Sequence, residues 1–246
     1  PWCAPVLLSM ESLTSFKPGS NAVVIGSSGG IGRSFVSALE ADPSFAQVST
    51  FSRSNPDRAI DLADEASIER AANSVGDELD LVIVATGILH DQQVQPEKAM
   101  RELDGSAMAT VLAANTIGPA LVDKHYLPRL RRDSKTVFEA LSARVGSISD
   151  NRLGGCTSYR ASKAALNMDI RTLSIEQARR RPESVVVGLH PGTVDTKLSA
   201  PFQRNVPQGK LFTPEIAATH LLRVIDGLQS RDSGGFFAWD GQAIDF

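Results

Sequence analysis

Two side chains with acid–base chemistry, Tyr159 and Lys163, stand four residues apart in the sequence. If this stretch is helical, both side chains leave the same face, one turn apart, and their polar ends can converge on one ligand. An ammonium beside a phenol favours the phenolate and lowers the phenol pKa toward neutral pH, which suits a proton donor. The same spacing also occurs on solvated helix faces, so the pair alone does not decide between catalysis and surface.

A glycine-rich turn early in the chain could hold a phosphate group. Residues 21–25 form a short apolar run that predicts a buried parallel strand, and residues 33–40 have apolar positions at helical spacing. The sequence between them is Gly26-Ser27-Ser28-Gly29-Gly30-Ile31-Gly32. Such glycines let the backbone approach a pyrophosphate, whose charge is stabilised by free N–H groups and the helix dipole. The turn therefore predicts a dinucleotide site.

The next predicted strand, residues 48–51, leads into Ser52 and Arg53, where a dinucleotide fold meets the adenosine ribose. An acidic residue there accepts from the 2′-hydroxyl of NAD, whereas arginine and small hydroxyls accommodate the 2′-phosphate of NADP. No Asp or Glu occupies this turn, so the sequence favours NADP(H) over NAD(H), unless Arg53 is only a solvated loop charge. Asp61, followed by Leu62, either caps the next helix or contacts the adenine amino group.

Strands and helices alternate along the rest of the chain. Apolar runs predict further buried strands at residues 80–87, 135–142, 184–190 and 235–239. Helices are predicted at residues 64–75, 104–126, 158–180 and 214–228. The pattern predicts an α/β fold: a single-domain Rossmann-type doubly wound parallel sheet of about seven strands, with helices on both faces. Asn115 interrupts the apolar face of its helix, and is either exposed to solvent or buried in a polar role.

Composition and charge exclude several classes of protein. With 246 residues, 42% of them hydrophobic, the chain suits one large soluble domain. A net charge of −3 gives no general attraction to nucleic acid or to an anionic membrane, and the apolar runs are expected to be too short to span a bilayer. The two cysteines and four scattered histidines have neither metal-ligand spacing nor a disulfide framework, so no metal site is predicted and a cytoplasmic location is expected.

The predicted organisation is an N-terminal extension, residues 1–19, followed by one domain, residues 20–246. No basic residue precedes the apolar stretch near the start, so a secretory signal is not expected. The stretch from Lys197 to Lys210 has two prolines and little periodicity, which suits either a substrate lid or a surface loop. Cys156, three residues before Tyr159, is predicted to be a wall of the site rather than a nucleophile.

The glycine turn, Asn115, Ser142 and the Tyr159/Lys163 pair resemble, in their order and spacing, the short-chain dehydrogenase/reductase family. Within the family the chain is most similar to small carbonyl reductases of the C-factor-like and sniffer-like group, which share its Tyr-Arg-x-Ser-Lys run and its Gly-Phe-Phe-x-Trp-Asp-Gly ending. The resemblance implies that Tyr159 is the general acid and that Lys163 lowers its pKa and holds the nicotinamide ribose. Ser142 would orient the substrate carbonyl, and Asn115 would support a water relay to the lysine.

The same resemblance implies a set of cofactor-binding residues that runs along the carboxyl ends of the strands. Its members are Gly26, Ser28, Gly30, Ile31, Gly32, Ser52, Arg53, Asp61, Leu62, Ala85, Thr86, Gly87, Asn115, Tyr159, Lys163, Pro191, Gly192, Val194 and Thr196.

Two departures from the family pattern affect the predicted site. The usual Asn-Ala-Gly after the third strand is Ala85-Thr86-Gly87 here, so the asparagine that steadies the sheet is missing. The family often has two serines at the end of the next strand, the second being catalytic, whereas Ser142 is followed by alanine. Because neighbouring strand residues face opposite sides, Ser142 points away from the substrate unless a bulge re-aims it, and Ser147 is a candidate substitute.

The resemblance implies an NADPH-dependent oxidoreductase that reduces an aldehyde, ketone or quinone to an alcohol, with Tyr159 as the proton donor. It also implies a homodimer or homotetramer. One alternative is a signalling or binding module that keeps the nucleotide fold with little catalysis. Another is an NAD-dependent alcohol dehydrogenase.

Overall fold

A computed structural model describes residues 12–92 and 94–246 of the chain. Its main sheet has six parallel strands. In spatial order they are β2 (Phe45–Phe51), β1 (Ser20–Ile25), β3 (Leu81–Val84), β4 (Thr136–Leu141), β5 (Ser184–His190) and β8 (Phe236–Ala238). A separate parallel pair joins β6 (Thr193–Val194) to β7 (Leu211–Phe212). The predicted doubly wound parallel sheet is confirmed, with six strands in the main sheet against the seven or so expected.

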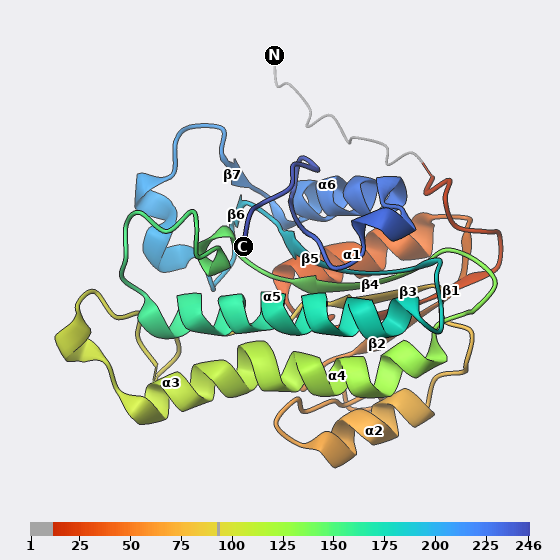
Figure 1. Ribbon diagram of the computed structural model, residues 1–246, viewed down its shortest axis with the longest axis horizontal. Coiled ribbons are helices and arrows are strands. Elements are labelled where there is room, and N and C mark those ends of the chain that lie inside the picture. The colour runs from red at the N-terminus through yellow and green to blue at the C-terminus, as the bar shows by residue number, and fades with distance from the viewer. Residues whose placement is uncertain (1–11, 93) are drawn as a thin grey trace.

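Helices cover both faces of the sheet (Figure 1). One face carries α2 (Glu65–Asn73), α3 (Gly105–Leu112), α4 (Gly118–Tyr126) and α5 (Thr157–Ala178), and the other carries α1 (Gly30–Ala41) and α6 (Pro214–Gly227). Each face has its own apolar core, so successive strand residues such as Val82 and Ile83 are both buried but belong to different cores. This explains why the central strands are continuous apolar runs rather than alternating ones.

Shorter helical turns connect these elements. They are η1 (Met100–Glu102), η2 (Ala113–Ile117), η3 (Leu127–Arg129), η4 (Arg144–Gly146), η5 (Ala200–Asn205) and η6 (Ser230–Asp232). The segments that contain η1, η4 and η5 gather at the end of the molecule where α5 begins (Figure 1). The stretch from Lys197 to Lys210 thus contains a helical turn rather than only irregular chain.

Helix starts follow the capping residues of the sequence. Asp64 caps α2 by accepting a hydrogen bond from the Ala66 N–H, and Thr213 caps α6 by accepting one from the Ile216 N–H. Asp61 does not cap α2; its side chain accepts from the Ala63 N–H inside the preceding turn. The cap falls to Asp64 because it directly precedes the helix.

Residues 12–19, predicted to belong to an N-terminal extension, pack against the domain. Leu13 and Phe16 are 2% and 5% exposed and join the core under α1 and α6. Asp42 accepts a hydrogen bond from the Leu13 N–H at 2.7 Å, and Asp226 accepts one from the Ser15 N–H at 2.8 Å. The domain therefore includes these residues, while residues 1–11 lie outside the described part.

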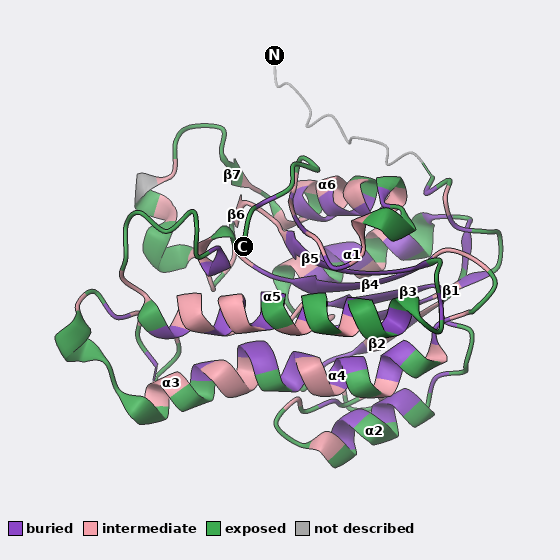
Figure 2. Ribbon diagram, viewed as in Figure 1, coloured by how far each residue is buried: buried purple, intermediate pink, exposed green. Residues whose placement is uncertain are grey.

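The helix that runs without a break from Gly105 to Arg129 is long and apolar enough to cross a membrane by length and composition, contrary to the expectation from the sequence. It nevertheless packs on the sheet in the way a domain helix does, because Val111, Val122 and Tyr126 are fully buried. About a third of its most apolar stretch is buried, and the remainder is half-buried or exposed (Figure 2). Ile117 is 56% exposed.

Candidate functional site

The glycine turn between β1 and α1 is shaped so that two of its positions accept only glycine. Gly26 has φ +90°, and a Cβ there would lie 2.6 Å from the Ala85 carbonyl oxygen. A Cβ on Gly32 would lie 2.2 Å from the Gly26 carbonyl oxygen. Helix α1 begins at Gly30 with no side-chain cap and no acidic residue in its first turn. Its first N–H groups are thus available to an anion.

Ser28, Ile31 and Thr196 lie in or next to this turn. Ser28 is exposed and Ile31 packs against the core, so the hydroxyl faces outward while the helix stays anchored. The Thr196 methyl would lie 3.1 Å from a Cβ on Gly30, which places Thr196, two positions after β6, beside the start of α1. The contact of Thr196 with a cofactor phosphate stays a prediction, and its hydroxyl donates to the Val194 carbonyl at 3.4 Å.

The end of β2 presents Ser52 and Arg53 differently. Ser52 is buried at 5% exposure, whereas Arg53 is exposed, and its guanidinium has no hydrogen-bond partner within residues 12–92 and 94–246. Asp61 and Leu62 follow in the loop before α2, where Leu62 packs against Gly118. An unpaired guanidinium at this position leaves its donors available to a phosphate.

Asn115 lies at the junction of β3, α3 and α5. Its Oδ1 accepts from the Ile88 N–H at 2.8 Å, and its Nδ2 donates to the Ile88 carbonyl at 2.8 Å and to the Ser162 hydroxyl at 3.0 Å. The side chain is fully buried, so the buried polar role is the correct alternative. The π-helical turn η2 carries Asn115, and such turns often mark functional sites.

The segment after β3 supplies the floor of the site. The Ala85 N–H donates to the Ile25 carbonyl at 2.8 Å, so the backbone holds the sheet at the position where the family's asparagine is missing. The Thr86 hydroxyl is buried without a hydrogen-bond partner among the described residues. A Cβ on Gly87 would lie 3.4 Å from Asn115 Oδ1 and 3.7 Å from Lys163 Nζ. Gly87 therefore lies next to both the Asn115 amide and the Lys163 ammonium.

Tyr159 and Lys163 lie on one face of α5, with Lys163 Nζ 5.9 Å from the centroid of the tyrosine ring. Lys163 is 3% exposed and donates to the Leu141 carbonyl at 2.7 Å. Burial lowers the pKa of Lys163 to about 8, opposed by the charge of Glu139. Burial also raises the pKa of Tyr159, and the nearby Cys156 adds to this.

The expectation that Lys163 lowers the tyrosine pKa stays a prediction, because the shift found for Tyr159 comes from burial and from Cys156. Lys163 is 3% exposed and Tyr159 is half-buried, and the burial of the phenol opposes the phenolate. The result keeps Tyr159 in the neutral form, which is the form able to donate a proton.

Neither candidate serine presents a free hydroxyl to Tyr159. Ser142 is 3% exposed and its hydroxyl donates to Asn167 Oδ1 at 2.6 Å, on the buried side of α5. Ser147 is 2% exposed and its hydroxyl donates to the Asp245 carbonyl. Whether either serine orients a carbonyl stays a prediction, and these contacts do not favour it.

The chain after β5 closes the other side of the site. Gly192, which follows Pro191, has φ +78°, and a Cβ there would lie 2.8 Å from the Phe212 ring. Val194 in β6 pairs with Phe212 in β7, so the stretch from Lys197 to Lys210 begins and ends at this small sheet. His90 Nε2 lies 2.9 Å from the Lys197 carbonyl and joins this stretch to the segment after β3.

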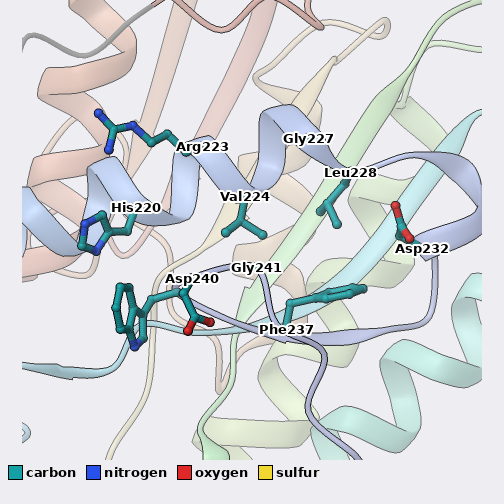
Figure 3. A pocket seen from close by; sticks show the side chains of 10 residues that line it. His220, Arg223, Val224, Gly227, Leu228, Asp232, Phe237, Asp240 and Gly241 are labelled. Atoms are coloured by element: carbon teal, nitrogen blue, oxygen red, sulfur yellow. The ribbon is translucent and has the colours of Figure 1, made fainter.

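A pocket of about 460 Å³ lies away from these residues, between α6 and the chain that follows β8 (Figure 3). Figure 3 shows His220 and Val224 on α6 facing Asp240 and Phe237 across it. None of its lining residues belongs to the predicted site. The Trp239 ring in its wall contacts Phe212 at a centroid distance of 4.7 Å. Both rings pack against the turn at Gly192.

Several residues near the site were not predicted from the sequence. Glu97 and Ser158 contact each other at the start of α5, and Asn167 receives the Ser142 hydrogen bond. Glu139 in β4 is fully buried with no hydrogen-bond partner in the described chain, and burial raises its pKa well above the ordinary value. The signals were present, since Asn167 follows Tyr159 by eight residues on the same helix face and Glu139 is a charge inside an apolar run.

Two further predictions concern groups that the site would lack. Across residues 12–92 and 94–246 no cluster of three His, Cys, Asp or Glu side chains could hold a metal ion. Cys156 is a free thiol whose pKa is raised by burial, which disfavours the thiolate that a nucleophile would need.

Comparison with known proteins identifies the class. The short chain dehydrogenase family profile matches residues 20–207, so the chain belongs to the short-chain dehydrogenase/reductase family and is an oxidoreductase. C-signal of Myxococcus xanthus is 37% identical over 147 residues, covering 59% of this chain and 82% of that protein.

Solved structures give the same class. The NADPH-bound carbonyl reductase from chicken fatty liver superposes with a TM-score of 0.81 at 27% identity, covering 94% of this chain and 96% of that one. The carbonyl reductase Sniffer of D. melanogaster has a TM-score of 0.78 at 21% identity, covering 93% and 99%, and shares the fold. The resemblance to C-factor-like and sniffer-like relatives is thus confirmed.

Proposed function

We propose that this protein is an NADPH-dependent carbonyl reductase that converts an aldehyde, ketone or quinone to an alcohol. The observation that carries the proposal is the convergence of Tyr159, Lys163 and Asn115 at the carboxyl edge of the sheet, beside Gly87. A neutral phenol held next to a buried lysine is a proton donor for a developing alkoxide. The likeness to an NADPH-bound carbonyl reductase at 27% identity supports the same chemistry.

The site fits a nicotinamide dinucleotide. Gly26 and Gly32 leave a cradle that a Cβ would fill, and the uncapped start of α1 offers N–H groups to a pyrophosphate. Arg53 would hold the 2′-phosphate, and Lys163 would hold the nicotinamide ribose. When bound, the cofactor supplies the hydride that reduces the carbonyl carbon.

The chain's own residues supply position and the proton. Tyr159 donates its hydroxyl proton to the carbonyl oxygen as negative charge develops there. The Lys163 ammonium, buried beside the ring, stabilises the phenolate that remains. Asn115 holds the backbone of Ile88 and the hydroxyl of Ser162, which itself donates to the Tyr159 carbonyl at 2.8 Å, and so fixes the turn of α5 that carries the tyrosine.

The test uses the two tyrosines of the chain. We expect Tyr159→Phe to lower kcat by about 10²- to 10⁴-fold, the usual contribution of a general acid, with NADPH affinity nearly unchanged. Tyr126→Phe is the matched control, because the Tyr126 hydroxyl is buried without a partner in the described chain and lies on α4. NADPH oxidation with a panel of aldehydes, ketones and quinones is the assay. A fully active Tyr159→Phe enzyme would overturn the mechanism.

The proposal includes a preference for NADP(H) over NAD(H), supported by Arg53 at the end of β2, which is exposed and has no hydrogen-bond partner among the described residues. Fluorescence titration of the protein with NADPH and with NADH measures the preference directly. Equal or tighter binding of NADH would instead favour the NAD-dependent alcohol dehydrogenase.

The proposal also includes a homodimer or homotetramer in the cytoplasm. The outward faces of α5 and of the long helix from Gly105 to Arg129 expose Ile117, Met168 and Ile175, at 56%, 65% and 49%. A second copy would remove this apolar surface from water. Light scattering on the purified protein measures the assembly. Within the described residues Cys156 is a free thiol, which supports a reducing compartment; cell fractionation tests this.

A second candidate function, a nucleotide-binding signalling module, is favoured by the 37% identity to a protein named C-signal. A module of that kind has no need of a proton donor. Tight NADPH binding with no turnover on any carbonyl of the panel would favour the module over the reductase.

A further inference from the structure

Helix α5 begins without a side-chain cap of its own. Cys156 stands at the N-cap position with φ 48° and ψ 45°, and its side chain makes no capping hydrogen bond. Gly154 and Gly155 before it also have positive φ, so three successive residues are left-handed. A left-handed cysteine is strained relative to glycine, and such a conformation persists only when the surrounding contacts hold it. Tyr159 lies in the first turn of the helix that follows.

Glu97, from the segment between β3 and α3, supplies the missing cap. Its carboxylate accepts from the Ser158 N–H at 3.3 Å and from the Ser158 hydroxyl. Its backbone carbonyl accepts from the Cys156 N–H at 2.6 Å. Glu97 is 6% exposed and Ser158 is 3% exposed, so these bonds are shielded from water. A carboxylate at a helix N-terminus is also stabilised by the helix dipole.

The residue on the other side of Tyr159 is held as well. The Arg160 guanidinium donates to the carbonyls of Gly155 at 2.9 Å, Gly154 at 3.1 Å and Val145 at 3.3 Å. Both sequence neighbours of Tyr159 are therefore fixed. Ser158 is held by the Glu97 carboxylate that accepts its hydrogen bonds, and Arg160 is held by the hydrogen bonds that its own guanidinium donates. The phenol is positioned by contacts that its own side chain does not make.

The segment that carries Glu97 is itself braced. The Val94 N–H donates to Asp91 Oδ1 at 2.7 Å, and the Lys98 N–H donates to Glu102 Oε2 at 2.8 Å. These bonds fix the backbone on both sides of Glu97, and so they fix the position of its carboxylate relative to α5.

We propose that Glu97 is a positioning residue for the reaction: by capping α5 at Ser158, it sets where the Tyr159 hydroxyl stands relative to a substrate carbonyl. This rests on the proposed function, in which Tyr159 is the proton donor. Small displacements of a catalytic group lower the rate steeply because the reacting atoms must be aligned to within fractions of an ångström. The cap should therefore act on kcat more than on cofactor binding.

The experiment compares Glu97→Ala and Glu97→Gln with a matched control. We expect Glu97→Ala to lower kcat about 10- to 100-fold, with the KM for NADPH nearly unchanged. Glu97→Gln keeps an oxygen acceptor for the Ser158 N–H and should bring kcat to within about fivefold of the parent enzyme. The readouts are kcat, the KM values for NADPH and for the carbonyl, and the melting temperature.

Asp226→Ala is the control, because Asp226 accepts from the N–H and hydroxyl of Thr14 and from the Ser15 N–H, an arrangement like that of Glu97 on the far side of the domain. We expect it to lower the melting temperature while leaving kcat unchanged. If Glu97→Ala loses stability as the control does and keeps its kcat, Glu97 is only structural and the inference fails.

A second comparison separates this inference from the proposed function. In a Tyr159→Phe background, Glu97→Ala should have no further effect on the residual rate, because there is no proton donor left to position. An equal loss in both backgrounds would overturn the positioning role. If Tyr159→Phe is itself fully active, the proposed function fails first, independently of Glu97.

Discussion

The two ends of the active-site edge are built by different means. At the nucleotide end, the turn between β1 and α1 is shaped by residues a few positions apart, such as Gly26 and Gly32. At the reacting end, the contacts join residues far apart in the sequence. Lys163 reaches Leu141 across 22 residues, Glu97 reaches Ser158 across 61 and Ser147 reaches Asp245 across 98. Backbone sterics shape the first end, and side chains held by tertiary packing shape the second.

The comparison predicts that one methyl group will break the nucleotide end. A Cβ on Gly32 would lie 2.2 Å from the Gly26 carbonyl oxygen, so Gly32→Ala must open the turn, and we expect NADPH affinity to fall about 100-fold or more. Gly29→Ala is the matched control in the same turn, because its Cβ would lie at an ordinary 3.4 Å. Isothermal titration with NADPH measures both. Equal losses in the two variants would contradict a steric cause.

Arg53 tests how much of the nucleotide end is electrostatic. Replacing it with alanine removes a charged donor from the 2′-phosphate, and we expect the KM for NADPH to rise about 10- to 100-fold. The KM for NADH should stay the same, because NADH has no phosphate there. Arg33→Ala is a control, since that guanidinium donates to the Ser28 carbonyl in the neighbouring turn. A rise for both cofactors would show that Arg53 acts on the fold instead.

The reacting end should respond to pH through Lys163. Burial lowers its pKa from 10.5 to about 8, so the ammonium is lost above that pH, and kcat/KM should fall by up to about tenfold per pH unit. Stability changes in the opposite direction. Between pH 8 and 10.5 the unfolded chain keeps a proton that the folded chain has lost, so Lys163 makes the free energy of unfolding rise with pH.

Lys135 separates these two effects. Burial lowers its pKa to about 8 as well, but it binds the carbonyls of Ile225 and Asp226, away from Tyr159. Lys135→Met should therefore change the pH dependence of unfolding and leave the pH profile of kcat/KM intact. A shifted activity profile in this variant would show that Lys163 does not control it.

The smallest expected effect concerns Ser142. Its hydroxyl donates to Asn167, so we expect Ser142→Ala to lower kcat less than about threefold and to reduce stability by about 1 kcal/mol. An oxyanion donor would instead be worth about 10²- to 10³-fold in kcat. Steady-state kinetics and urea unfolding distinguish the two outcomes. A fall in kcat of about 10²- to 10³-fold would instead indicate that Ser142 has the catalytic role implied by the family pattern.

Much of the fold could be predicted from the sequence. The apolar run at Ser184–His190 predicts β5 at its observed bounds, and the helix predicted at residues 214–228 is α6, which begins at Pro214 after the Thr213 cap. Both depend on a few consecutive residues, whose periodicity and capping chemistry are local properties. The candidate site was predicted less completely. Tyr159, Lys163 and Asn115 lie together, but the environment that sets the pKa of Tyr159 is a matter of burial, which spacing does not express.

The sequence by itself determined where the glycine turn after β1 and the Tyr159/Lys163 pair stand, because positive φ, helix period and strand ends are properties of neighbouring residues. Only the tertiary structure decided which groups hold them. It turned Ser142 toward Asn167 and placed Glu97 over the start of α5. Whether a hydroxyl is free to bind a substrate depends on hydrogen-bond partners that folding brings from tens of residues away. Such long-range pairs produce no periodic pattern in the sequence from which they could be predicted.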